Sequence, residues 1–216
     1  MCTIAHHSMT LKPIRLIDLF RYYRALPHQN AALHELEQAV LNAAPDTFNR
    51  DQNWYTTWSA AVNDKQYGPA IQIIKEFEGC HLHAYRCPAN VMTIGWGTTQ
   101  YPGGARVKLG DSISKQRADE LLVLEIDRIA GVLSDSIPYW QEMNINQRSA
   151  LISFAYNLGA YFMHNSGFAT ISRTLMAKHW DGVPEAMLLY RNPGSHFEAG
   201  LKRRRIAEGN LWIKPV

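Results

Sequence analysis

Residues 78–97 read EGCHLHAYRCPANVMTIGWG, and the hydrophobic pattern of the chain changes at this stretch. The segment before it carries apolar residues at helical spacing, namely Ala70, Ile73, Ile74 and Phe77. From Ala84 to about Val107, apolar residues are instead broken by Pro and Gly, which is typical of short strands and turns. The sequence therefore predicts a helix with Gly79 as its C-terminal cap, followed by a small β-region.

Helical periodicity returns after the β-region. Ser114 is expected to begin a long helix whose buried face is made of Leu122, Ile126, Ile129 and Leu133. A further helix is apolar enough to be fully buried, with Leu151, Phe154, Ala155 and Leu158. Helical segments continue through Leu211. A helix, a small sheet and a helical bundle in this order predict an α+β fold.

A small, mainly helical module of residues 1–68 is expected before a main domain of residues 69–216, with the boundary at Gly68-Pro69. The module ends in a segment that contains Trp54, Tyr55 and Trp58. These rings could bind sugars of a cell wall, or they could fill a small core or pack on the main domain. About 68 residues give a marginal core, so we favour packing.

Composition limits the classes of partner. Of the 216 residues 46% are hydrophobic and 19% charged, as in a globular protein that buries a core, and the net charge is +3. This weak charge excludes the dense basic face of a nucleic-acid binder but suits an anionic cell wall. The run Lys202–Arg205 is interpreted as a solvated cluster in the last turn of a helix, favoured by the helix dipole.

No apolar run reaches the length of a membrane span, and Pro13, Arg15 and Asp18 interrupt the early apolar segment. We therefore expect neither a signal peptide nor stable membrane insertion, and synthesis in a cytoplasm. Cys80 and Cys87 could pair in an oxidising compartment, although their spacing does not establish the geometry. With His81 and His83 between them, these cysteines fit no familiar zinc pattern, so we expect no metal and no cofactor.

Glu78 is the residue with the clearest potential for chemistry. It closes the predicted helix, where the negative end of the helix dipole disfavours a carboxylate. Its proton should therefore be held more tightly than that of a free glutamate, as a general acid requires. Taken alone, a glutamate before a helix-ending glycine is usually a solvated surface residue.

Three separated segments together resemble the phage lysozymes of glycoside hydrolase family 24. The family pattern is Glu, eight residues, Asp or Cys, five residues, then Thr and Ile-Gly-aromatic-Gly; Glu78, Cys87 and Thr93 fit every spacing. Residues 150–159 (ALISFAYNLG) resemble the family's buried central helix. Residues 200–205 (GLKRRR), followed by Glu208 and Trp212, resemble its C-terminal signature.

The resemblance implies a lysozyme-like fold with a small β-lobe and a helical lobe, and a glycan chain bound between them. It also implies hydrolysis of the β-1,4 bond between N-acetylmuramic acid and N-acetylglucosamine. Glu78 would protonate the leaving oxygen. A water near Cys87 and Thr93 would attack the opposite face and invert the anomeric centre. Tyr156 and Asn157 match positions that face the cleft, as substrate-binding residues or as satisfied core residues.

Cys87 stands where the general inverting scheme asks for a second carboxylate, although the family accepts Asp or Cys there. A thiol of ordinary pKa is mostly neutral at pH 7, so Cys87 is a poor base; we favour a role in orienting water together with Thr93. If deprotonated, Cys87 could instead act as base or even as nucleophile, and it could also be purely structural. The family usually has histidine where this chain has Thr98, which can form hydrogen bonds but carries no charge.

The sequence as a whole predicts a muramidase that acts as a phage or prophage endolysin, a monomer whose partner is bacterial peptidoglycan. It would act on the wall or in the periplasm after a holin-type protein has permeabilised the membrane. The alternatives are a lytic transglycosylase, which forms an anhydro product, and a wall-binding protein that keeps the fold without turnover.

Overall fold

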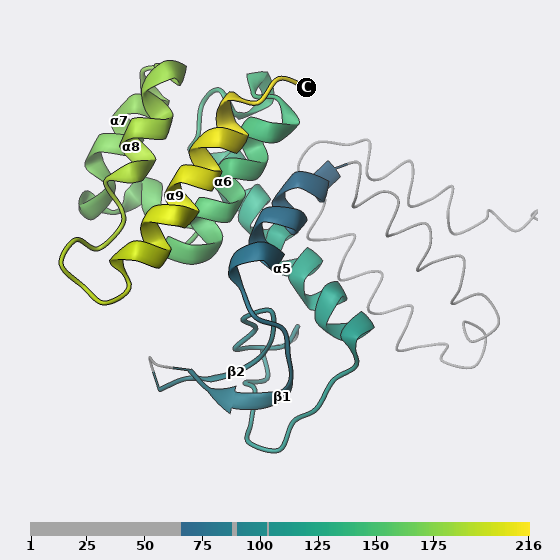
Figure 1. Ribbon diagram of the computed structural model, residues 1–216. Coiled ribbons are helices and arrows are strands. Elements are labelled where there is room, and N and C mark those ends of the chain that lie inside the picture. The colour runs from purple at the N-terminus through teal and green to yellow at the C-terminus, as the bar shows by residue number, and fades with distance from the viewer. Residues whose placement is uncertain (1–65, 88–89, 103) are drawn as a thin grey trace, which may run out of the picture. The chain divides into compact units, whose positions relative to one another are not determined.

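The computed structural model describes residues 66–87, 90–102 and 104–216 (Figure 1). The predicted N-terminal module, including Trp54, Tyr55 and Trp58, lies outside the described residues except for its last three positions. Residues 66–77 form one helix, which runs without a break through Gly68 and Pro69. The division of the chain at this point stays a prediction.

A two-stranded antiparallel sheet follows that helix. Strand β1 comprises His81–Arg86 and strand β2 comprises Met92–Gly95. Tyr85 lies opposite Thr93 in this ladder, and Arg86 lies opposite Met92. The expected strands and turns are thus confirmed.

The predicted C-terminal cap at Gly79 is wrong, because Gly79 does not adopt the left-handed backbone conformation on which such a cap depends. It is instead covered by a side chain, since a Cβ at this position would lie 3.1 Å from Nε2 of His81. Left-handed backbone occurs later in the segment, at Gly95 (φ 64°) and Gly97 (φ 122°), where the chain turns after β2.

Five helices form most of the remaining chain: α5 (Lys115–Ser136), α6 (Ile145–Leu158), α7 (Ala169–Met176), α8 (Val183–Leu188) and α9 (Glu198–Ile213). Short 3-10 turns lie between them at Trp140–Glu142, Phe162–His164, Ser166–Phe168 and Trp180–Gly182. Ser114 caps α5 by accepting a hydrogen bond from the backbone N–H of Arg117, as its position in the sequence predicts. No helix in the part of the chain that the structure describes has the length and apolar character needed to cross a membrane.

Helix α6 is the centre of the helical region. It packs against α5 and α9, and α8 covers another part of α9 (Figure 1). Leu151, Ile152 and Phe154 are almost completely buried in it, and the ring of Phe154 meets that of Phe162 edge to face with centroids 5.2 Å apart. The expectation of a buried central helix and an α+β fold is confirmed.

Trp96 joins the sheet region to the helices. Its indole N–H donates to Oδ1 of Asp119 on α5 at 2.7 Å, and its backbone carbonyl accepts from the hydroxyl of Tyr156 on α6 at 2.9 Å. The ammonium groups of Lys75 and Lys115 lie 5.2 and 4.6 Å from the centre of its ring. Both lysines also pair with Asp119 at 2.8 Å. The end of β2 is therefore tied to three helices at one residue.

Candidate active site

Glu78 directly follows the last residue of the 66–77 helix, and its backbone N–H donates to the carbonyl of Ile74 at 2.9 Å. Its side chain is 27% exposed, and Oε1 accepts a hydrogen bond from Nη1 of Arg204 at 2.6 Å. The carboxyl group therefore lies between the negative end of the helix dipole and a guanidinium, which have opposite influences on its surroundings. Sequence reasoning considered only the first of these influences.

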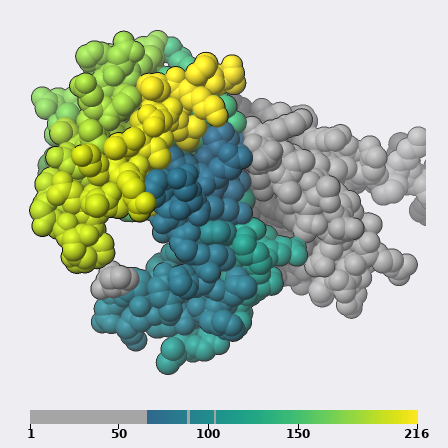
Figure 2. Space-filling view, viewed as in Figure 1, coloured from purple at the N-terminus to yellow at the C-terminus, as the bar shows by residue number. Residues whose placement is uncertain are grey.

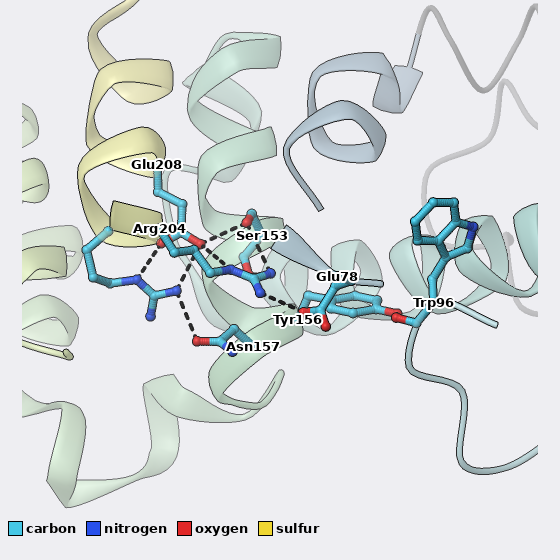
Figure 3. A network of polar contacts seen from close by, with 8 residues as sticks. Glu78, Trp96, Ser153, Tyr156, Asn157, Arg204 and Glu208 are labelled. Atoms are coloured by element: carbon cyan, nitrogen blue, oxygen red, sulfur yellow. Dashed lines mark hydrogen bonds and ion pairs between the residues drawn. The ribbon is translucent and has the colours of Figure 1, made fainter. Parts of the chain in front are cut away.

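Arg204 belongs to a buried network of charges (Figure 3). Its side chain is only 4% exposed, and its Nε donates to Oε1 of Glu208 at 3.2 Å. Glu208 is fully buried, accepts from Oγ of Ser153 at 2.8 Å and pairs with Nε of Arg205 at 2.7 Å. Burial raises the pKa of Glu208, and the charges of Arg205 and Arg204 act in the opposite direction. Two buried guanidinium groups therefore share one buried carboxylate, and Glu78 completes the network at its exposed end.

The interpretation of Lys202–Arg205 as a solvated cluster in a last helical turn is wrong for half of the run. Lys202 and Arg203 are exposed, whereas Arg204 and Arg205 are buried. All four lie in the interior of α9 rather than at its end. The two buried arginines precede Glu208 by four and three residues, so they meet its carboxylate on one face of the helix. The Arg-Arg-x-x-Glu spacing is the sequence signal that could have found this network.

The β1–β2 hairpin supplies the other half of the candidate site. Tyr85 pairs with Thr93, and the backbone N–H of Cys87 donates to the carbonyl of Val91 at 2.9 Å. Side chains alternate along a strand and opposite residues share a face, so Cys87 and Thr93 lie on the same face of the hairpin. Thr93 is 4% exposed, and its Oγ1 donates to the carbonyl of Val91 at 3.1 Å.

The disulfide that the sequence left open is not formed, because Cys80 carries a free thiol. Thr98 contributes to the hairpin through its backbone, which exchanges hydrogen bonds of 2.9 and 2.8 Å with Ile94. The structure thus assigns Thr98 a contribution to the turn that does not depend on its side chain.

Tyr156 and Asn157 lie near the C-terminal end of α6, and each has a polar partner within the protein. The hydroxyl of Tyr156 is bonded to the carbonyl of Trp96, and burial, followed by the charge of Glu78, raises the pKa of Tyr156. Oδ1 of Asn157 accepts from Nη2 of Arg205 at 3.1 Å. Substrate contact through the Tyr156 ring and the Asn157 amide NH2 stays a prediction.

The surface is hollowed between the β1–β2 hairpin and the yellow-green segment that leads into α9 (Figure 2). Glu78, on the chain between the 66–77 helix and β1, is held by a residue of α9. The candidate acid thus connects the segment before the hairpin with α9.

Comparison with known proteins agrees with this arrangement. The family model described as phage lysozyme matches residues 75–208. The endolysin of Lactococcus phage c2 is 38% identical over 148 residues, which cover 68% of this chain and 59% of that relative. The endolysin of Salmonella phage P22 is 31% identical over 137 residues, covering 62% of this chain and 89% of the relative. This chain therefore spans less than two thirds of the Lactococcus phage protein but most of the P22 protein.

Solved structures show the same similarity. An endolysin from Escherichia coli O157:H7 phage FAHEc1 superposes with a TM-score of 0.59 at 29% identity, covering 68% of this chain and 92% of that one. A variant of P22 lysozyme superposes with a TM-score of 0.55 at 27% identity, covering 67% and 95%. The chain belongs to the phage lysozyme family, and its described part has the lysozyme-like α+β fold.

Proposed function

We propose that this protein is a muramidase that hydrolyses the β-1,4 bond between N-acetylmuramic acid and N-acetylglucosamine in bacterial peptidoglycan, and that it acts as an endolysin. The observation that carries the proposal is the ion pair of 2.6 Å between Glu78 and Arg204. It holds a partly exposed carboxyl group on the chain between the 66–77 helix and the β1–β2 hairpin. Membership of the phage lysozyme family supports the same reaction.

In this proposal Glu78 donates its proton to the oxygen of the leaving sugar. Arg204 holds the carboxyl group in place and then stabilises the carboxylate that forms. The guanidinium does not act on Glu78 alone, because it also binds the carboxylate of Glu208 at 3.2 Å. Arg204 is therefore shared between the carboxyl group of Glu78 and the buried carboxylate of Glu208.

A water on the hairpin side attacks the anomeric carbon from the opposite face, which gives inversion. Cys87 and Thr93 are the proposed residues that orient this water. The thiol takes the position of a second carboxylate, and a neutral thiol is a weak base. Cys87 also favours a second candidate, a lytic transglycosylase, in which a hydroxyl group of muramic acid replaces the water and an anhydro sugar is released.

Digestion of purified peptidoglycan by wild type, Glu78→Gln and Glu76→Gln tests the proposal. Glu76 lies two residues before the candidate acid and is exposed, so it is the matched control. Glu78→Gln is expected to lose about 10²–10⁴-fold in rate, because the amide has no proton to transfer, while Glu76→Gln stays near wild type. Full activity of Glu78→Gln would refute the assignment of the acid.

The products separate the two candidate reactions. Mass spectrometry and NMR of the released fragments distinguish reducing muramic ends of α configuration, expected for inversion, from anhydro ends, expected for a transglycosylase. Binding of wall fragments by wild type without any new ends would instead identify a protein that keeps the fold without turnover.

We also propose that the protein works as a monomer and reaches the wall after a holin-type protein has permeabilised the membrane. Light scattering after gel filtration measures the mass of the particle. Expression in bacteria with and without a separate membrane-permeabilising agent is expected to give lysis only with that agent. Lysis without it would exclude the requirement for a holin.

A further inference from the structure

The hairpin face that carries Cys87 and Thr93 carries a third functional side chain, Tyr85. Tyr85 is the direct cross-strand partner of Thr93 and precedes Cys87 by two residues on the same face. Directly opposite residues of an antiparallel pair have Cβ atoms about 4.5–5.5 Å apart. The Cβ of Tyr85 is therefore the neighbour of Thr93 across the ladder and of Cys87 along the chain.

His81 fixes the ring of Tyr85. The two ring centroids are 4.2 Å apart with planes inclined by 40°. The Nε2–Cδ2 edge of the imidazole covers Gly79, where an added Cβ would lie 3.1 Å from Nε2 and 3.7 Å from Cδ2. The two tilted rings therefore extend from Gly79, the residue next to Glu78, to the position opposite Thr93.

The electrostatic surroundings of Tyr85 agree with this position. Burial raises its pKa, and the charges of Cys87 and then Glu78 act in the same direction. Cys87 and Glu78 are thus near enough to affect the pKa of the Tyr85 phenol. A raised pKa keeps the hydroxyl neutral near pH 7, and a neutral hydroxyl can both donate and accept a hydrogen bond.

Thr93 is limited in how it can bind water, because its hydroxyl hydrogen is used for the carbonyl of Val91. Its Oγ1 can still accept a hydrogen bond from water. The phenol oxygen of Tyr85 supplies a second acceptor on the same face. A water that donates one hydrogen to each acceptor has both O–H bonds fixed, so a lone pair points away from the hairpin toward a bound sugar.

We propose that Tyr85 binds the attacking water together with Thr93, and that His81 is a positioning residue that holds the Tyr85 ring. This inference rests on the proposed muramidase reaction. Tyr85 gains and loses no proton; it holds the water oxygen in line as the bond to the anomeric carbon forms and the bond to the leaving oxygen breaks. The leaving oxygen takes the proton of Glu78, and the proton that the attacking water loses passes to the solvent and in turn restores the acid. Two neutral acceptors thus position a water in a site that has a thiol where a second carboxylate could stand.

Tyr85→Phe is the direct test, because it keeps the stacked ring and removes only the oxygen. We expect kcat to fall about 10–100-fold, with KM and the affinity for a chitin oligosaccharide within twofold and Tm within about 2 °C of wild type. Tyr161→Phe is the control, since Tyr161 is 64% exposed. Wild-type kcat in Tyr85→Phe would overturn the proposal, and so would a rise in KM alone, which would indicate a sugar contact.

Two further measurements exclude a purely structural effect. If Tyr85 and Thr93 hold the same water, Tyr85→Phe combined with Thr93→Val should lower kcat by less than the product of the single effects; full additivity counts against a shared water. His81→Ala should lower kcat severalfold and His81→Phe should restore it, because a phenyl ring can stack where a methyl group cannot. Equal kcat in His81→Ala and wild type would remove the positioning role.

The same measurements distinguish a failure of the proposed Tyr85 role from a failure of the proposed hydrolysis. If wild type releases reducing ends and Tyr85→Phe keeps its kcat, only the role of Tyr85 is lost. If wild type releases anhydro ends or none, no water attacks the sugar, and the proposed hydrolysis is refuted with it.

Discussion

The two halves of the candidate site are built differently. On the helical side, Glu78 is bound by Arg204, which is almost fully buried and shares Glu208 with Arg205. On the hairpin side, Thr93 stands on β2 and Cys87 directly follows β1, and backbone hydrogen bonds join these two segments. One half is held by a cluster of buried charges on α9, and the other mainly by local backbone pairing.

In the proposed reaction, this difference gives the more rigid support to the proton donor. A proton donor must keep one position relative to the leaving oxygen, and a buried charge network opposes movement because separating its members leaves unpaired charges in a low-dielectric interior. An attacking water needs only hydrogen-bond acceptors that orient it toward the sugar, which a small hairpin can provide. Regions with few buried contacts open at a lower free energy, so the hairpin is expected to exchange its amide hydrogens before α6 and α9.

The largest expected effect comes from breaking the helical half. Glu208→Gln leaves the guanidinium groups of Arg204 and Arg205 without their shared counter-charge, so the free energy of unfolding should fall by about 3–5 kcal/mol. Urea denaturation followed by circular dichroism measures it. Glu142→Gln, which removes an exposed ion pair with Lys178, is the control and should change stability by under about 1 kcal/mol. A change of similar size in both variants would contradict the comparison.

The hairpin half should respond in activity rather than stability. Thr93→Val removes the acceptor proposed to bind water, together with the hydrogen bond to Val91, so kcat is expected to fall about 10–100-fold while unfolding changes by only about 1 kcal/mol. Ser136→Ala is the control, because its hydroxyl also donates to a backbone carbonyl, that of Val132. A large loss of stability with unchanged kcat per folded molecule would place Thr93 among structural residues only.

The smallest effect is expected where the halves are joined, at Asp119. Burial favours its neutral form, but hydrogen bonds from Lys115, Lys75 and Trp96 outweigh burial and lower its pKa below 3.8. The stabilisation is therefore present above the unfolded pKa and is lost as pH falls through the lower folded pKa.

Asp119→Asn should thus destabilise the protein by under about 1 kcal/mol at pH 7, since the carboxylate is 38% exposed, and the difference should vanish in acid. Thermal unfolding from pH 7 down to pH 3 measures this dependence, with the exposed Asp135→Asn as control. A difference that grows toward low pH would contradict the sign.

Local patterns were sufficient for most of the fold. Ser114 at the start of α5 and the apolar run of α6 are features of neighbouring residues, and both were predicted correctly. The cap at Gly79 was predicted wrongly because a glycine after a helix can serve another purpose. Here it leaves room for His81, which is a tertiary contact that helical periodicity does not contain.

The candidate site was predictable only in part. The spacing of Glu78, Cys87 and Thr93 indicated a reaction through a family resemblance, and the pairing of Tyr85 with Thr93 brings Cys87 and Thr93 to one face. The partner of Glu78 could not be found in the same way, because Arg204 is 126 residues away and looked like one member of a solvated basic run. Burial of such a residue depends on how α9 packs on α6, which no single segment specifies.

The separation of Glu78 and Arg204 along the chain also determines when their ion pair can form during synthesis. A ribosome adds about 5–20 residues per second, so the 126 residues that separate the pair take on the order of 6–25 seconds to follow the candidate acid out. During that interval the nascent chain has the hairpin but lacks the guanidinium that holds the acid. The candidate acid is therefore without its guanidinium partner until α9 has been translated.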